Sequence, residues 1–363
     1  MAKPGRDRVS CHHMRESIEG MVGHLGVPGI QCVVVDAERS LFEHAGGWAD
    51  VAGRKRMEPD TTTMLYSMTK TFTAAAVLQL VEAGEVDLDA PFRHYVPHTP
   101  YGDAVTIRHL LSQTSGIPNP VPLKWVHLAA EHPQFDEHAA LDAVLKVHGK
   151  TDFAPGKKYG YSNIAYWILG RVIEQVSDMT FDAYMEKNIF GRLGLHSSEI
   201  GFVVPTPAHH AKGYIPKYSF MNLSKSLLME RRFFGSYEGR WFHIKDHYLN
   251  GPAFGGLVAS GRAVAVFLQD QLKARSVLFG REIKDLFYQQ QKNNRGKPVP
   301  MTLGWHVGRA KGKHYFYKEG GGGGFHGEMR IYQDTGIAAV AVANDATFRA
   351  GNFLDRICRD FRR

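Results

Sequence analysis

The sequence has 363 residues but only three cysteines, and it lacks any long apolar run. Cys11, Cys32 and Cys358 are an odd, scattered set, which excludes a disulfide framework and a cysteine-rich metal module. No stretch approaches the roughly 20 apolar residues that span a bilayer, and no apolar signal core follows the charged start. We therefore predict reduced thiols, no membrane span and a cytoplasmic location.

Metal-binding and nucleic-acid-binding patterns are also missing. The pairs His12-His13 and His209-His210 are adjacent, and no His-Glu-x-x-His occurs, so we expect no metal and no cofactor. The net charge of +8 favours anionic partners, but neither a helix-turn-helix pattern nor an aromatic-interleaved RNA motif accompanies it. We expect no nucleic-acid partner and interpret the charge as the basic surface of an enzyme.

The 44% apolar content is sufficient for a folded core, and strand-like patterns lie at both ends of the chain with helix-like patterns between them. This order predicts one sheet domain, residues 1–66 and 262–363, with a mainly helical domain, residues 67–261, inserted in it. The functional cleft is expected between the two. Strands are predicted at 30–35, 41–46, 303–308, 314–317, 329–332 and 337–343, and helices at 14–26, 71–82, 106–113, 139–148, 164–177, 181–193 and 352–361.

Ser67-Met68-Thr69-Lys70 is the only Ser-x-x-Lys tetrad in the chain, and it opens the helix predicted at 71–82. A serine and a lysine three residues apart on one helical face lie within reach of each other, so the lysine amine can take the serine's proton. Loss of that proton makes the hydroxyl a nucleophile. The alternative is a solvated helix start with Ser67 as its N-cap, because a chain of this length contains roughly one such tetrad by chance.

Two further motifs have equally ordinary alternatives. Tyr161-Ser162-Asn163 follows a turn-forming segment and precedes an apolar helix, so it also fits a turn with asparagine as the helix cap. Lys318-Glu319-Gly320 ends an aromatic strand and enters a run of five glycines, so it also fits a hairpin turn with an exposed lysine.

In this order, the three motifs resemble those of the serine β-lactamase-like hydrolases, which include class C β-lactamases, D-Ala-D-Ala carboxypeptidases and family VIII carboxylesterases. The resemblance covers nearly the whole chain. It implies an α+β, β-lactamase-like fold, in which an antiparallel sheet is flanked by terminal helices and carries an inserted, mainly helical domain. Gln113 stands where histidine is usual in the family. The other matching segments are 66–74, 86–89, 106–117, 153–156, 255–260 and 303–305.

The resemblance also implies a role for each motif residue. Ser67 attacks the substrate carbonyl, Lys70 is the first candidate general base, and Tyr161 is its partner or a proton shuttle. Which of Lys70 and Tyr161 takes the first proton stays open, and a phenol that titrates near 10 needs cationic neighbours to act as a base. The remaining implied roles are positive charge from Lys318, orientation of the acyl group by Asn163, and an oxyanion site bordered by Gly320 and completed by the N–H of Gly321.

Substrate class depends on Glu319 and Gly321, which stand where β-lactamases of this type usually carry hydroxyl residues that hold the β-lactam carboxylate. A glutamate there repels a carboxylate unless it turns away or pairs with a cation. We therefore expect a serine hydrolase that forms an acyl-enzyme on small carboxylic esters, a carboxylesterase. Two alternatives stay open: a D-amino-acid peptidase or amidase, with weak β-lactamase activity, and a penicillin-binding-like sensor without turnover.

The segment 212–248 is rich in aromatic and basic residues. In the family's plan an insertion at residues 201–250 borders the cleft. The segment then either forms an apolar wall or lid, or packs on the helical domain or at a dimer contact. The sequence leaves the oligomeric state open.

Overall fold

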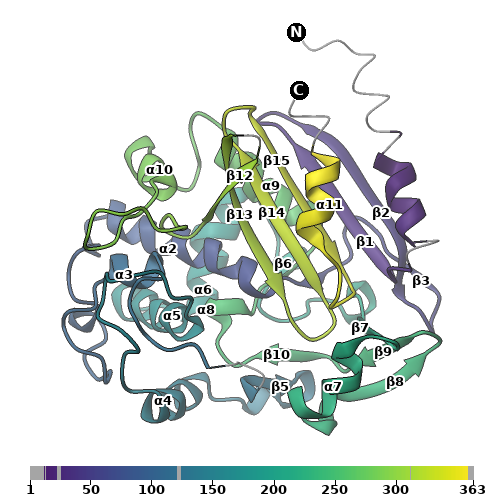
Figure 1. Ribbon diagram of the computed structural model, residues 1–363, viewed down its shortest axis with the longest axis horizontal. Coiled ribbons are helices and arrows are strands. Elements are labelled where there is room, and N and C mark those ends of the chain that lie inside the picture. Colours follow the sequence, from purple (N-terminus) through teal and green to yellow (C-terminus); the bar gives the residue numbers. More distant parts are fainter. Residues whose placement is uncertain (1–11, 13, 23–25, 121–123, 311, 359–363) are drawn as a thin grey trace.

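A computed structural model of the chain describes residues 12, 14–22, 26–120, 124–310 and 312–358. Its centre is a seven-stranded antiparallel sheet in which the two ends of the chain meet (Figure 1). In spatial order the strands are β12 (His306–Ala310), β13 (Lys313–Gly321), β14 (His326–Tyr332), β15 (Ile337–Ala343), β1 (Gly29–Val35), β2 (Ser40–Asp50) and β3 (Lys55–Arg56). β1 pairs with β15 so that Ile30 lies opposite Ala343 and Val35 opposite Ala338.

Helices lie on both faces of the central sheet, and further helices lie beside it (Figure 1). They are α2 (Thr69–Glu82), α3 (Ile107–Leu111), α4 (Glu137–Val147), α5 (Asn163–Ser177), α6 (Phe181–Met185), α7 (Phe220–Leu228), α8 (Pro252–Gly255), α9 (Gly261–Leu272), α10 (Arg281–Tyr288) and α11 (Ala350–Ile357). α2 is buried on all sides from Thr69 to Leu80 and packs against α5 and α8.

The largely apolar sequence of β1, interrupted only by Gln31, follows from this double cover, because successive side chains of a strand point to opposite faces. Val33 and Val35 join the core that contains α2 and α9. Cys32 and Val34 join a second core, against α11 and the helical residues 14–22. All seven residues of β1 are therefore buried. Cys32 is a free thiol, and burial raises its pKa.

Three smaller sheets frame the helical region. The segment predicted as a cleft-bordering insertion forms one of them, together with α7. The strands are β7 (Gly213–Pro216), β9 (Trp241–Ile244) and β8 (Phe234–Glu238); β5 (Val126–Leu128) and β10 (His247–Leu249); and β4 (Thr63–Met64), β11 (Val258–Ala259) and β6 (Ile200–Gly201).

Most of the predicted elements are confirmed within one to four residues, but two predictions are wrong in part. The strand predicted at 303–308 begins only at His306, because Gly304 has a φ of 134° and turns the chain before it. The helix predicted at 181–193 is α only to Met185 and continues as a π turn, Glu186–Phe190, and a 3-10 turn, Gly191–Leu193. The predicted residues 23–25 and 359–361, and Cys11, lie outside the described part of the chain.

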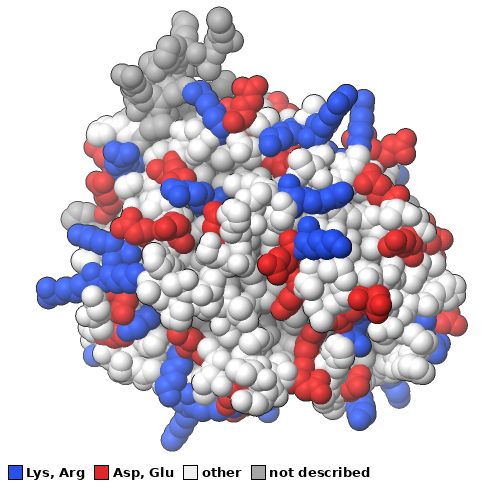
Figure 2. All heavy atoms as spheres, turned by 180° about the vertical axis from the view of Figure 1, so that it is seen from behind, with Lys and Arg blue, Asp and Glu red and all other residues white. Residues whose placement is uncertain are grey.

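Basic and acidic side chains are interspersed on the face shown in Figure 2, rather than gathered into a band of one sign. Among the helices of the described residues, none is long and apolar enough to cross a membrane.

Candidate active site

Ser67 lies in a 3-10 turn, Tyr66–Met68, that leads directly into α2. The residue before it, Tyr66, has a left-handed φ of 45°, which a non-glycine side chain adopts only when its surroundings hold it there. The Tyr66 hydroxyl donates to the Gly323 carbonyl at 2.9 Å and lies 3.2 Å from His247 Nε2. These contacts fix the turn that presents the Ser67 hydroxyl.

Lys70 is fully buried and has three partners. Its Nζ lies 3.0 Å from Ser67 Oγ, 2.6 Å from Asn163 Oδ1 and 2.7 Å from the Phe254 carbonyl oxygen. Burial first, and then the charge of Lys318, hold the pKa of the Lys70 amine well below its usual value. A neutral amine has two N–H groups and one lone pair. The two carbonyl oxygens take the N–H groups, so the lone pair is left for Ser67.

Tyr161 also contacts Ser67, and its hydroxyl donates to Ser67 Oγ at 2.6 Å. Burial raises the pKa of this phenol and outweighs the hydrogen bond to Ser67, which lowers it; Tyr159 and Glu319 add smaller upward contributions. The expectation that cationic neighbours lower this pKa therefore differs from the structure, in which desolvation dominates.

Ser162 and Asn163 hold Tyr161 at the start of α5. Ser162 is the N-cap, and its Oγ accepts from Ala165 N at 3.1 Å. Gln113 binds the same residue from outside the helix: its Oε1 accepts from Ser162 N at 2.5 Å and its Nε2 donates to Ser162 O at 3.1 Å. An amide offers a donor and an acceptor side by side, so it can satisfy both backbone groups. Gln113, which stands where histidine is usual in the family, thus holds the start of α5 in place.

Asn163 has a partner that the sequence did not indicate. Its Oδ1 accepts from Lys70, and the residue is only 6% exposed. The role in orienting the acyl group stays a prediction, since the amide oxygen already faces the lysine.

Lys318 lies on β13 beside the glycine run and is fully buried. Its Nζ has no hydrogen-bond partner in the described part of the chain, and it lies 5.5 Å from the centre of the Tyr161 ring. Burial lowers the pKa of its amine to about 7. The site therefore contains two buried amines, one bonded to Ser67 and one free.

The end of β13 lies directly against the turn that carries Ser67. A Cβ atom added to Gly320 would lie 2.0 Å from the Leu65 carbonyl oxygen and 3.0 Å from the Ser67 nitrogen. Only glycine permits this approach. Gly321, the predicted second oxyanion donor, lines the same cavity as Ser67, and its donor role stays a prediction.

A cavity of about 480 Å³ opens at Ser67 and Tyr161. Apolar side chains form much of its wall, and four of them belong to the insertion or to the chain that follows β15. Residues of the segment 212–248 therefore line this cavity. The other lining residues are Ile215, Met221, Lys225, Met229, His306, Glu319, Gly321, Gly322, Gly323, His326 and Ala346.

Glu319 is paired rather than free in this cavity. Its Oε1 lies 2.8 Å from His326 Nε2, and about half of its side chain is exposed. The hydrogen bond from His326 is the main reason that the pKa of Glu319 is lowered. The carboxylate therefore remains a negative group near Ser67, with an imidazole beside it.

His306 was missed by the sequence analysis, which stopped one residue earlier, at Trp305. The imidazole lines the cavity and stacks on Tyr161, with ring centres 6.3 Å apart and planes 19° apart. Burial, followed by the charges of Lys318 and Lys70, lowers its pKa to about 2, so the ring is neutral. Its Nε2 lies 3.2 Å from the Tyr159 hydroxyl. Phe254, the acceptor for Lys70, was likewise missed next to a matching segment.

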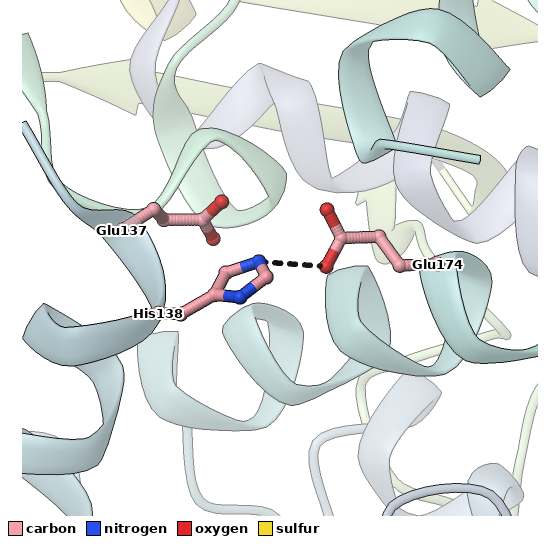
Figure 3. A group of neighbouring side chains, drawn as sticks. All are labelled: Glu137, His138 and Glu174. Carbon is pink, nitrogen blue, oxygen red and sulfur yellow. Dashed lines mark ion pairs between the residues drawn. The ribbon is translucent and has the colours of Figure 1, made fainter. Parts of the chain in front are cut away.

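A separate cluster of possible metal ligands contains Glu137, His138 and Glu174, whose ligand atoms lie within 4.8 Å of one another (Figure 3). Several of its polar atoms already have partners. Arg171 Nη1 contacts both His138 Nε2 and Glu174 Oε2, and Trp167 Nε1 donates to Glu137 Oε1 at 2.8 Å. Because a guanidinium occupies the position of a cation, we assign no ligand to this cluster.

The sequence pattern of the Beta-lactamase family matches residues 14–357, and the chain therefore belongs to this family. Penicillin-binding protein 4* of Bacillus subtilis (strain 168) is 24% identical over 296 residues, which make up 80% of this chain and 62% of that protein. The chain thus spans less than two thirds of that relative's length.

Solved structures share the fold. D-amino acid amidase from Ochrobactrum anthropi SV3, in complex with L-phenylalanine amide, has a TM-score of 0.77 and 18% identity, covering 98% of this chain and 99% of that one. EstCE1, a hydrolase with promiscuous acyltransferase activity, has a TM-score of 0.73 and 18% identity, with the same coverage. The predicted α+β, β-lactamase-like fold is confirmed.

Proposed function

We propose that the chain is a serine hydrolase that forms an acyl-enzyme through Ser67 and acts on small carboxylic esters. The observation that carries this proposal is the position of Ser67 Oγ at the cavity wall, 2.6 Å from the Tyr161 hydroxyl and 3.0 Å from Lys70 Nζ. A hydroxyl between a neutral amine and a phenol can give up its proton on one side and be held in position from the other.

In acylation, Lys70 takes the first proton, because its amine is neutral whereas the Tyr161 phenol keeps its own proton. Ser67 Oγ bonds to the substrate carbonyl carbon as its proton passes to Lys70, and the carbonyl oxygen becomes an oxyanion near the N–H groups of Ser67 and Gly321. When this intermediate collapses, the bond to the alcohol oxygen breaks. Tyr161 gives its proton to the leaving alkoxide and regains one from the Lys70 ammonium.

In deacylation, the same groups act in the reverse direction. Tyr161 passes the proton of an attacking water toward Lys70, and the bond between the acyl carbon and Ser67 Oγ breaks. Ser67 Oγ is reprotonated from Lys70. Every proton is thus returned, and the products are a carboxylic acid and an alcohol.

Two features support esters as the substrate class. Methionine and aliphatic side chains of the insertion line the cavity and suit an uncharged acyl or alcohol group. An ester also needs less activation of its leaving group than an amide does. We propose that Glu319, with its lowered pKa, disfavours substrates that present a carboxylate at this position.

A second candidate is an amidase for amino-acid amides, and the Glu319 carboxylate favours it. A carboxylate within the cavity complements a substrate ammonium group. Exchanging Glu319 for Thr distinguishes these possibilities. We expect the variant to acylate with a β-lactam chromogen faster than the wild type does, and to lose activity only toward amine-bearing substrates. Unchanged rates on all three substrate classes would remove Glu319 as the discriminator.

The proposed nucleophile is tested with p-nitrophenyl esters of increasing chain length, a cephalosporin chromogen and a D-alanyl amide. We expect Ser67→Ala to reduce kcat on the best ester by about 10³-fold or more, while the exposed Ser197→Ala stays at the wild-type rate. Mass spectrometry should detect an acyl adduct on wild type only. Full activity of Ser67→Ala contradicts the mechanism, and complete inactivity of the wild type favours the non-catalytic sensor.

A further inference from the structure

α7 carries apolar side chains on the face that points away from the protein. Phe220, Leu223 and Leu227 lie three and four residues apart, on one helical face, and are 83%, 83% and 89% exposed. Tyr218, just before the helix, is 90% exposed. Single exposed apolar residues are ordinary, but four within ten residues form a patch that marks an interaction surface. We call Tyr218, Phe220, Leu223 and Leu227 the outer face of α7.

The inner face of the same helix belongs to the cavity. Met221 and Lys225 line the cavity that opens at Ser67. Met221 also packs against the small core of Ile215, Phe242 and Ile244. α7 therefore forms part of the cavity wall, and apolar side chains lie on both its inner and its outer side. Figure 1 shows α7 at the edge of the molecule, away from the central sheet.

Basic side chains flank the outer face. Lys217 and Arg240 are exposed and joined through their backbones, since Lys217 N donates to the Arg240 carbonyl at 2.9 Å, and the Arg240 guanidinium packs against Gly26. Arg231 is exposed just beyond the other end of α7. Among the described residues these three cations form no ion pair, whereas the neighbouring Arg232 is paired with Glu131 and Glu230.

We propose that the outer face of α7 docks onto the surface of an anionic lipid bilayer. Apolar side chains flanked by lysine and arginine are the composition of segments that lie in a membrane interface, where the cations meet acidic headgroups. Docking there places the wall of the cavity against the phase in which apolar esters accumulate. The proposed docking to a membrane does not depend on the ester activity proposed above.

A second copy of the chain fits these observations less well. A two-fold contact through α7 brings each patch against its own copy, so the unpaired Lys217 and Arg240 approach the same cations of the partner. Four side chains are also few compared with the roughly 20–30 residues per side of a stable protein interface. The outer face of α7 lies at the edge of the molecule, on the side of the helix away from the cavity, which favours a planar partner over a peptide.

The test is co-sedimentation of the purified chain with large unilamellar vesicles. Wild type should bind vesicles of phosphatidylcholine with 30% phosphatidylserine at least tenfold more tightly than pure phosphatidylcholine vesicles, and 0.5 M NaCl should weaken this binding. Leu223→Gln with Leu227→Gln should reduce binding at least tenfold. Lys217→Glu with Arg240→Glu should remove the preference for phosphatidylserine.

The matched control is Val147→Gln, which replaces a 75% exposed apolar residue at the end of α4. It should bind as wild type does. All variants should keep the wild-type melting temperature and the wild-type rate on a water-soluble ester, because none of the replaced side chains lines the cavity. Unchanged binding of the double leucine variant overturns the proposal. The proposal is also overturned if analytical ultracentrifugation shows a wild-type dimer that the leucine exchanges dissociate. The outer face of α7 would then be a contact between two copies of the chain.

Discussion

Two lysine amines, those of Lys70 and Lys318, are fully buried in one site, although burial strongly disfavours a charged amine. Lys70 has three hydrogen-bond partners, whereas the described residues supply none for Lys318. Because Lys318 has no hydrogen-bond partner among the described residues, we infer that it acts on the site through its charge. Protonated Lys318 makes a second positive charge at Lys70 unfavourable, which favours the neutral amine that the proposed mechanism uses as a base.

The pH profile of a Lys318→Met variant tests this coupling. Met preserves the length of the side chain but removes the charge, so the pKa of Lys70 should rise. The neutral base then forms only at higher pH, and the acid limb of kcat/KM on an ester should move upward by about one pH unit. Lys158→Met, which removes an exposed charge near Tyr161 in sequence, should leave the profile in place. An acid limb that stays fixed or moves downward contradicts the coupling.

Lys318→Met should also change the free energy of unfolding, and proton linkage determines the direction of this change. The pKa of Lys318 is about 7 in the folded chain and 10.5 when unperturbed, so the unfolded state binds more protons between these values. Folding stability therefore rises with pH across this window. Lys318→Met should be more stable than wild type at pH 7, by a few kcal/mol at most. The difference should shrink toward pH 10 in urea unfolding curves.

Among the secondary-structure elements, the contact between β13 and the turn Tyr66–Met68 positions the site. Gly320→Ala places a Cβ atom 2.0 Å from the Leu65 carbonyl oxygen, and a backbone atom cannot move aside as a side chain can. We expect kcat to fall by about 10²-fold or more, because Ser67, the proposed nucleophile, is displaced, together with a lower melting temperature. Gly102→Ala, where no atom lies within 4 Å of the added Cβ, is the control. A Gly320→Ala variant with wild-type kcat would show that the strand does not set this geometry.

The start of α5 depends on Gln113 in a comparable way. Gln113→Met keeps the approximate volume but removes both hydrogen bonds to Ser162. The buried Ser162 N–H then lacks its partner and the Ser162 carbonyl loses one of its donors, so we expect a loss of about 1–3 kcal/mol in urea unfolding. Because Tyr161 and Asn163 flank Ser162, kcat should fall about tenfold or more as well. Gln134→Met at an exposed position is the control. A variant that loses stability but retains kcat would show that Gln113 stabilises the fold without positioning Tyr161 or Asn163.

At the scale of the whole molecule, Asn344 joins three distant parts of the chain. Its Nδ2 lies 3.0 Å from the Trp48 carbonyl oxygen, 3.3 Å from that of Ala49 and 3.0 Å from that of Lys212. The side chain, just after β15, thus links the N-terminal hairpin, the C-terminal part of the sheet and the insertion. Asn344 itself is fully buried, and its bonds to Trp48 and Lys212 are partly buried.

Asn344→Ala should lower the free energy of unfolding by about 2–4 kcal/mol, because buried carbonyl oxygens lose their donor. The folded variant should keep a kcat close to wild type, since Asn344 does not line the cavity. Asn352→Ala, at an exposed position of α11, should cause no comparable loss in thermal or urea unfolding. Equal stability of the two variants would show that this link contributes little.

Prediction from sequence succeeded where a pattern reports local chemistry. The apolar run of β1 and the alternation in its neighbours indicated buried strands, and the motif order indicated the family. Prediction from sequence failed where a residue distant in the sequence determines the local backbone or side-chain position. The chain turns at Gly304, so β12 begins late, and His306 enters the cavity because it stacks on Tyr161, a contact that no short segment encodes. Glu319 was expected to repel carboxylates unless paired, and only the fold supplied His326 as its partner.

The sequence by itself determined the kind of fold and the residues with the required chemistry, because strand and helix patterns and the Ser-x-x-Lys spacing act within a few residues. The tertiary structure alone decided that Tyr161, 94 residues from Ser67, reaches its hydroxyl. It also decided which amine loses its proton, because desolvation depends on everything packed around Lys70 and Lys318. The apolar outer face of α7 likewise became apparent only once the inner face was seen to line the cavity.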